Sequence, residues 1–237
     1  MKIGILKNKL GINDYDKLNQ AEADLTFSKF LNIEKTFRTN FDINYVKAIH
    51  KHIFEDIFDW AGEFRNVPIV KEEVVLPGLS LNYAESKDIP KRLEAVLNKM
   101  NTTNWDTLPL EEKSMEFTKQ LTQFWLVHPF RDGNTRTTLT FATKFSKEHG
   151  FPLDLSCLLD ELSRKTNENG KITRFSIRDK FVLSAIPEEF SPEPEHLNFL
   201  IHKSMVSGIS KNIQSLQNTL NSNSDATSQN RNDDDAR

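Results

Sequence analysis

Nine consecutive residues, from His128 to Arg136, carry side chains that suit chemistry at a phosphate group. An imidazole such as that of His128 has an ordinary pKa near ~6.5 and accepts a proton at neutral pH, and Asp132 offers the hard oxygen ligand that Mg²⁺ prefers. The turn at Gly133 and Asn134 directs backbone N–H groups to one point at a helix start, where the helix dipole favours an anion. Arg136 adds a guanidinium for phosphate oxygens. The combination predicts phosphoryl or nucleotidyl transfer.

A plainer interpretation of the same residues stays open. Pro129 alone would end a helix at His128, because the residue before a proline avoids the α conformation. The turn that follows would then be an ordinary loop, with Arg136 on the surface. Under either interpretation, His128 lies at the C-terminus of one helix and the next helix begins shortly after the turn.

Helices are predicted on both sides of this loop and through most of the chain. Apolar residues recur at steps of three and four positions, which is the period of a helix with one buried face. Only 8 of the 237 residues are glycine and 17 are phenylalanine, a composition that suits long helices joined by short loops. The predicted fold class is mainly α, with helices over residues 14–41, 43–62, 83–100, 111–127, 137–149, 155–165, 174–186 and 195–207.

Residues 67–77 break this helical period. Two clusters of β-branched residues flank a short charged centre, which predicts two strands joined as a hairpin. Pro68 and Pro77 restrict such a hairpin to an edge or a separate flap, and we expect it to lie against the helices, because a lone hairpin is only marginally stable. Glu72 and Glu73 would form its solvated turn.

The length of the chain favours one domain, over residues 1–213, followed by a polar tail. Residues 214–237 are rich in Asn, Ser, Gln, Thr and Asp, and such a segment buries too little apolar surface to offset the entropy lost on folding. We therefore predict that this tail is disordered.

Charge and composition exclude several classes of function. The formal net charge is −3, which gives no general attraction for nucleic acid or for an anionic membrane. A single cysteine, Cys157, excludes an intrachain disulfide framework and a cysteine-based zinc site. The longest apolar run, 124–127, is far too short to span a bilayer, and the first residues lack the pattern of a signal peptide. We expect a cytoplasmic protein, with delivery into another cell as an open alternative.

Three ordered blocks resemble the Fic family. Residues 128–136 resemble its signature, His-Pro-Phe-x-(Asp/Glu)-Gly-Asn-Gly-Arg, with Thr135 in place of the second glycine. Residues 49–65 resemble an earlier helix of the family with a His…Phe…Trp-Ala-Gly…Arg pattern, and residues 8–12 are similar to the start of many members. The resemblance covers roughly residues 8–200.

This resemblance implies a Fic-fold helical bundle with a small β-hairpin flap next to the active-site loop. It also implies a reaction, which is commonly the transfer of AMP from ATP to a Tyr, Ser or Thr hydroxyl of a target protein. Carried over to this chain, His128 would be the general base, and Asp132 would hold Mg²⁺ on the α- and β-phosphates. Phe130 would fix the loop from the core.

The remaining site residues follow from the same resemblance. Gly133, Asn134 and the backbone at Thr135 would bind the phosphates of the nucleotide, and Arg136 would hold the β-phosphate. A flap would dock the target segment by strand addition, which aligns a hydroxyl through main-chain hydrogen bonds. The flap residues that match the family are Val75, Leu76 and Pro77.

Two positions depart from the family pattern. A Cβ at Thr135 is tolerated if φ is negative and otherwise costs about 1–2 kcal/mol. Leu139 stands where many members carry a second arginine, which binds the γ-phosphate or pairs with an inhibitory glutamate; a buried helix position explains Leu139 equally well. The (Ser/Thr)-x-x-x-Glu-(Gly/Asn) pattern that supplies this glutamate has no complete match here, so an inhibitory partner protein stays an open alternative.

Other functions stay open as well. Transfer of a phosphoryl group, or of a nucleotide other than AMP, would use the same loop. A non-catalytic module would keep the flap and lose the chemistry. His50 and His52 form a His-x-His pattern, and His52 and Asp56, which share a helix face at i,i+4, could suggest a metal pair. We interpret these residues as structural parts of the earlier helix.

Overall fold

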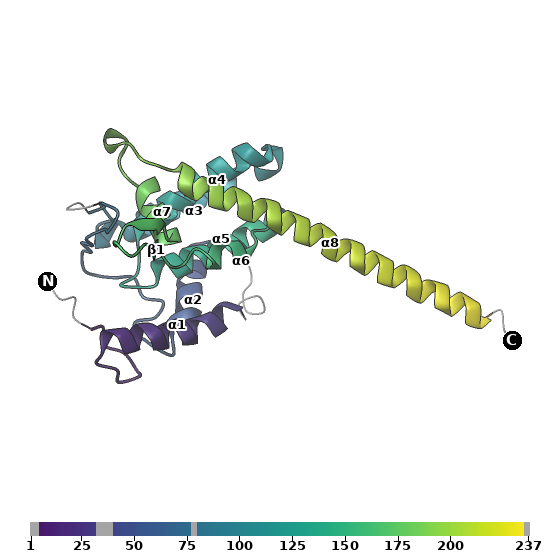
Figure 1. Ribbon diagram of the computed structural model, residues 1–237, viewed down its shortest axis with the longest axis horizontal. Coiled ribbons are helices and arrows are strands. Elements are labelled where there is room, and N and C mark those ends of the chain that lie inside the picture. The colour runs from purple at the N-terminus through teal and green to yellow at the C-terminus, as the bar shows by residue number, and fades with distance from the viewer. Residues whose placement is uncertain (1–4, 32–39, 77–79, 235–237) are drawn as a thin grey trace.

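Helices dominate the computed structural model, which describes residues 5–31, 40–76 and 80–234 (Figure 1). Within these residues, three short 3₁₀ helices accompany the α-helices, at Ser86–Asp88, Trp105–Thr107 and Glu188–Phe190. The α-helices are α1 (Tyr15–Leu31), α2 (Ile43–Phe54), α3 (Ile89–Thr102), α4 (Leu110–Val127), α5 (Asn134–Glu148), α6 (Leu155–Leu159), α7 (Ile177–Ser184) and α8 (Glu195–Asp234). The prediction of a mainly α fold is confirmed.

The centre of the bundle is α4, which contacts α3, α5, α7 and α8, while α2 packs against α1, α3 and α5. The abundance of phenylalanine explains how these faces fit together, because aromatic rings fill the space between them and pair edge to face or in stacks. Phe141, for example, stacks on Phe124 with a centroid distance of 4.8 Å. Other fully buried rings are Phe117, Trp125, Phe145, Phe151 and Phe181.

The loop between α4 and α5 begins and ends at residues in the left-handed conformation. α4 ends at His128, with φ 48° and ψ 59°, because the following Pro129 excludes the helical conformation there. Gly133 precedes α5 with φ 74°, and a Cβ at this glycine would lie 2.3 Å from ring atoms of Phe54. The chain therefore needs glycine at position 133 both for its backbone conformation and for its close approach to α2.

The predicted hairpin over 67–77 is wrong in its described part. Residues 67–76 contain no strand, and Pro77 lies outside the described residues. Side-chain contacts hold this segment instead of a strand ladder: Glu73 is fully buried and pairs with Arg178, whereas Glu72 is exposed as expected. The buried Glu73 thus corrects the prediction of a solvated turn.

A two-stranded antiparallel sheet forms elsewhere, from β1 (Lys165–Thr166) and β2 (Ile172–Arg174), with Lys165 opposite Arg174. Its turn contains Gly170 at φ 74°, a left-handed conformation that glycine adopts readily because it has no Cβ. The helix predicted over 155–165 is correspondingly shorter, since α6 ends at Leu159.

α8 extends well beyond the helix predicted at 195–207. Its first part packs against α4, α6 and α7, and it then leaves the body as one helix, drawn in yellow in Figure 1. Disorder is predicted from residue 214, but the structure has a helix there. The side chains at 211–219 are nevertheless all exposed and bury little apolar surface. The separation of a tail from the domain stays a prediction. Within the described ranges, every helix is too short or too polar to cross a membrane.

Candidate active site

A cavity of about 690 Å³ opens beside the loop between α4 and α5. Its walls come from α1, the segment at Lys71, the loop itself, and the α5, α6 and α7 helices. The predicted site residues that line it are His128, Asp132, Gly133, Asn134, Thr135 and Arg136. The structure therefore brings together the base, the carboxylate and the phosphate-binding turn that the sequence places in this loop.

Hydrogen bonds from Arg65 to backbone carbonyls hold His128 in place. The Arg65 Nε–H donates to the carbonyl oxygen of His128 at 2.8 Å, and the Arg65 backbone N–H donates to the carbonyl of Pro129 at 2.9 Å. The ring of His128 lies against Tyr83, with 4.2 Å between the ring centroids. Only 1% of His128 is exposed, yet its side chain borders the cavity, so the imidazole is both fixed and within reach of a bound molecule.

The two nitrogens of this imidazole have different partners. Nε2 lies 3.3 Å from Nζ of Lys71, and Nδ1 lies 3.4 Å from the carbonyl oxygen of Trp125. An ammonium group only donates and a carbonyl only accepts, so Nδ1 carries the hydrogen and Nε2 carries the lone pair. This is the tautomer that a base needs if its Nε2 faces the substrate.

Burial lowers the pKa of His128 well below its usual value, and the positive charges of Lys71 and Arg178 lower it further. The imidazole is therefore neutral at neutral pH, with its lone pair available once Lys71 is displaced. A buried neutral histidine beside a cavity is a functional-site signature, because catalytic bases need a suitable pKa and a fixed position.

The loop around this base is closed by Asn134 and His50. The side chain of Asn134 accepts from the N–H of Phe130 at 2.9 Å and donates to the carbonyl of the same residue at 2.8 Å. His50 stacks on Phe130 at 3.8 Å and donates from Nε2 to the carbonyl of Asp132 at 3.1 Å. His50 accepts from Gly62 and is fully buried, and burial lowers its pKa to about 3. The interpretation of His50 as structural fits these contacts.

The same contacts determine which groups of Asn134 and Thr135 are available to bind a phosphate. The Oδ1 and one N–H of the Asn134 side chain are used within the loop. Its backbone N–H belongs to the first turn of α5, has no intrahelical acceptor and is available to a phosphate. Thr135 lies in α5 without a positive φ, so its Cβ is tolerated. Its hydroxyl accepts from Trp125 Nε1 at 3.0 Å and keeps its own hydrogen for a bound anion.

The carboxylate of Asp132 lies half-buried at the edge of the cavity. One of its oxygens accepts from the N–H of Gly133 at 2.6 Å. No cationic side chain within the described ranges lies at ion-pair distance from it, in contrast to most other buried acids around the cavity. Asp132 therefore keeps oxygen lone pairs for a cation that arrives with a ligand.

Arg136 already has a partner. Its guanidinium pairs with Glu22 of α1, donates to Thr26 Oγ1 at 3.2 Å and lies over the ring of Phe54 at 4.7 Å. Burial raises the pKa of Glu22, while the charge of Arg136 opposes that shift. Sequence reasoning missed Glu22, which lies 114 residues from Arg136 and carries no motif of its own.

A second charged group that the sequence did not reveal borders the cavity on the α7 side. Glu73 accepts from the Tyr83 hydroxyl at 2.7 Å and from Arg178 at 2.8 Å, and Arg178 and Lys71 both line the cavity. Glu73 and Arg178 are 105 residues apart in the sequence, so no local pattern could have predicted their contact. The flap residues Val75 and Leu76, by contrast, pack against the core and do not line the cavity.

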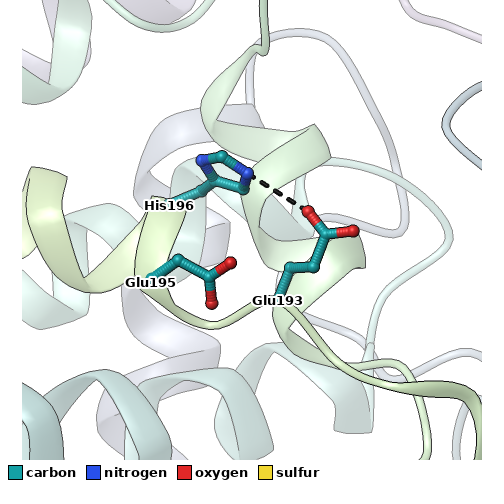
Figure 2. Close-up of side chains that lie close together, drawn as sticks. All are labelled: Glu193, Glu195 and His196. Carbon is teal, nitrogen blue, oxygen red and sulfur yellow. Dashed lines mark hydrogen bonds and ion pairs between the residues drawn. The ribbon is translucent and has the colours of Figure 1, made fainter.

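A separate group of titratable side chains lies away from this cavity, at the start of α8 (Figure 2). Glu193 and Glu195 are exposed, and Nε2 of His196 lies 3.2 Å from a carboxylate oxygen of Glu193. Such exposed groups stay hydrated, and the nearby Glu188 and Glu189 are exposed as well.

The sequence profile of the Fic/DOC family matches residues 40–146, a range that includes α2, the segment at Lys71 and the whole loop from α4 to α5. This part of the chain is similar to a Fic/DOC domain. Its fold agrees with that assignment. The crystal structure of an N-terminal Fic domain of a VirB-translocated effector of Bartonella quintana, with bound ADP, superposes with a TM-score of 0.65 at 23% identity, over 86% of this chain and 92% of that one.

Two curated relatives match a larger share of this chain than the family profile does. The protein adenylyltransferase VbhT of Bartonella schoenbuchensis is 27% identical over 153 residues, which are 64% of this chain and 30% of that protein. A probable protein adenylyltransferase Fic of Salmonella typhimurium is 24% identical over 78% of this chain and 90% of its own length. The match thus spans less than a third of VbhT but most of the Salmonella protein.

Proposed function

We propose that this chain is a protein adenylyltransferase, which transfers AMP from ATP to a Tyr, Ser or Thr hydroxyl of a target protein. The observation that carries this proposal is the neutral His128, whose Nε2 lone pair borders the same cavity as the N-terminus of α5. A base and an anion site in one cavity suit the activation of an alcohol beside a phosphate. The names of the relatives VbhT and Fic support this reaction over others.

His128 would act on the target hydroxyl. Its Nε2 takes the hydroxyl proton, and the oxygen attacks the α-phosphorus of ATP. The new bond joins AMP to the target, while the bond between the α-phosphorus and the bridging oxygen breaks and pyrophosphate leaves with that electron pair. The carbonyl of Trp125 beside Nδ1–H keeps the ring oriented and stabilises the imidazolium that forms.

The phosphates would lie at the start of α5. Backbone N–H groups of its first turn and the Thr135 hydroxyl supply oriented donors, and the helix dipole adds a partial positive charge. Arg136 would hold the β-phosphate after exchanging Glu22 for it. Such fixed donors favour the charge that develops on the phosphates in the transition state without further reorganisation.

The residues present fit Mg²⁺ as a companion of the nucleotide. Asp132 has a free carboxylate oxygen at the cavity and no cationic partner within the described residues, and Mg²⁺ binds proteins through one or two carboxylates together with substrate phosphates. Asp132 would therefore hold the ion. When bound, Mg²⁺ neutralises part of the phosphate charge and thereby favours the departure of pyrophosphate.

The target segment would dock along residues 75–77, in keeping with Val75, Leu76 and Pro77 as flap residues. The described backbone before them runs without a strand partner, and Val70 and Val74 expose 84% and 61% of their surface. An extended target segment could use these backbone groups with little demand on its own sequence.

Isotope labelling tests the reaction directly. The purified protein with Mg²⁺ and cell lysate should label protein bands from α-³²P-ATP but not from γ-³²P-ATP. His128→Ala should abolish the label, whereas the matched control His196→Ala, at a half-buried histidine outside the cavity, should keep it. Mass spectrometry of a labelled band should show the mass of AMP on a hydroxyl residue.

Two other outcomes would replace this proposal. Label from γ-³²P-ATP alone would assign a phosphotransferase, and label from another nucleotide alone would assign a different nucleotidyltransferase. A non-catalytic binding module is the second candidate, and the pairing of Arg136 with Glu22 favours it, because this arginine is already neutralised. Folded protein that transfers no label from any nucleotide would establish it.

A further inference from the structure

Three cationic side chains line the cavity, and they differ in their partners. Arg136 pairs with Glu22, and Arg178 pairs with Glu73 at 2.6 Å. Lys71 has no carboxylate within ion-pair distance in the part of the chain that the structure describes. A cation in a partly closed cavity loses much of its hydration, so an unpaired one is costly unless it serves an anionic ligand.

The partner that Lys71 does have is the base itself. Its ammonium lies 3.3 Å from Nε2 of His128 and can only donate, so it occupies the lone pair that must accept the proton of the target hydroxyl. In the arrangement described here, His128 has the right tautomer and charge, but its lone pair is covered. Catalysis by this histidine requires that Lys71 move.

We propose that Lys71 is a phosphate-binding residue that changes partner: its ammonium donates to His128 Nε2 in the empty cavity and turns to the phosphate chain of an entering nucleotide, which frees the lone pair of His128. The identity of the substrate in this inference rests on the proposed function. The nucleotide thereby exposes the base only when the group to be transferred is in place.

The charges around Lys71 make this exchange favourable. A phosphate oxygen is a stronger acceptor for an ammonium than a neutral imidazole, because the hydrogen bond is charge-assisted on both sides. Arg178 and Arg65 also face Lys71 and repel it, and they are themselves held by Glu73 and by backbone carbonyls. Asp132, in the loop where the phosphates would bind, attracts Lys71 more strongly than Glu73 does.

The segment that carries Lys71 allows the movement. Residues 67–76 form no strand, so a shift of the Lys71 side chain breaks no ladder hydrogen bond. Lysine itself has a flexible four-carbon stem with three rotatable donors, which suits a change of partner better than a planar guanidinium does. Burial already lowers the pKa of Lys71, in line with an ammonium that lacks a compensating anion.

Binding of nucleotides to Lys71→Met tests the phosphate contact. Methionine keeps the apolar stem and removes the charge. Calorimetry should show that ATP and ADP bind about 10- to 100-fold more weakly, the range expected for losing a hydrogen bond to a charged group, while adenosine binding is unchanged. Lys91→Met, at an exposed position on α3, is the matched control, and Lys71→Arg should restore most of the affinity.

Imidazole ¹⁵N spectra test the release of the base. In the wild type, a non-hydrolysable ATP analogue should shift the Nε2 signal of His128 toward the chemical shift of an imidazole nitrogen whose lone pair accepts no hydrogen bond. Lys71→Met should show that shifted signal before any nucleotide is added, and the analogue should then change it little. If Lys71 had only a structural role, the His128 signal of Lys71→Met without nucleotide would not match that of the wild type with the analogue.

The inference fails if Lys71→Met binds ATP with wild-type affinity, or if the analogue leaves the His128 signal unchanged in the wild type. Either result can coexist with intact transfer of AMP, which would leave the proposed function standing. Conversely, nucleotide binding that depends on Lys71 without any transfer of label would contradict the proposed function and support the phosphate contact.

Discussion

Two segments that meet at His128 are held in opposite ways. Hydrogen bonds to its own backbone close the loop from 128 to 136: Asn134 bonds both backbone groups of Phe130, and Asp132 bonds the N–H of Gly133. Arg65 and His50 add hydrogen bonds to its backbone carbonyls. The segment from 67 to 76 has no strand and is held largely by side chains from distant elements, such as Arg178 on Glu73. The loop therefore fixes where the base lies, whereas the segment sets which charges surround it.

Because of this difference, the site has a rigid part, the loop at 128–136, and an adjustable part, the charged side chains around it. Closed hydrogen bonds and stacked rings resist movement, because each has a satisfied partner that a shift would expose. Charged side chains on flexible stems can exchange one partner for another at much lower cost. Changes in the loop should accordingly reduce stability, and changes in the charged residues should alter ligand binding.

Gly133→Ala should have the largest effect, because it breaks the rigid part. The added Cβ would lie 2.3 Å from Phe54 ring atoms and would also sit at a φ of 74°. We expect a loss of roughly 2–4 kcal/mol in the free energy of unfolding, from backbone strain together with overpacking, and loss of transfer activity. Urea denaturation followed by circular dichroism measures the loss.

Gly170→Ala provides the control for that measurement. Gly170 has the same φ of 74°, but a Cβ there meets nothing within 4 Å. It should cost only the backbone term, about 1–2 kcal/mol. Equal losses for the two variants would show that contact with Phe54 does not hold the loop in place.

Acidification should weaken the loop through its histidines. The pKa of His50 is about 3 in the folded protein, below its unfolded value near ~6.5, so the unfolded state binds more protons between these values. Stability should therefore fall as pH drops from about 6.5 toward 3, by up to roughly 1.4 kcal/mol per pH unit for His50. His128, whose pKa is also lowered, should add a similar slope.

His50→Gln separates these two contributions. Glutamine can still donate to the Asp132 carbonyl but does not titrate, so the slope of unfolding free energy against pH should fall by about half. Urea denaturation at several pH values between 5 and 7.5 measures it. An unchanged slope would mean that His50 is not the buried neutral group that joins α2 to the loop.

Glu22→Gln should have the smallest effect and should test the adjustable part. Removing the charge frees Arg136 and takes a negative group away from the phosphate site, so ATP should bind about three- to tenfold more tightly, with little change in stability. Asp24→Asn is the control, since Asp24 lies on the same helix and lines the same cavity without pairing with Arg136. Equal gains from both variants would indicate a general charge effect instead of release of Arg136.

Much of the site and of the fold could be predicted because the signals are local. The hydrogen bonds within the loop span four residues or fewer, as between Asn134 and Phe130, and the apolar period of α4 and α5 places the loop between two helices. The bonds to the loop from Arg65 and His50 span more than 60 residues and carry no local signal. The prediction of a hairpin is wrong over residues 67–76, because the β-branched residues there have no partner strand, while Glu73 forms a buried ion pair. Strand propensity depends on such partners more than helix propensity does.

The amino-acid sequence by itself determined that helices flank the loop, that α4 ends at His128, and that a turn opens α5, since proline, glycine and a side chain four residues away act within the loop. Only the tertiary structure decided the charges that face the base. Glu22 reaches Arg136 across 114 residues and Lys71 reaches His128 across 57. Pairs of that separation form only when the packed core brings their elements together, and no local pattern records them.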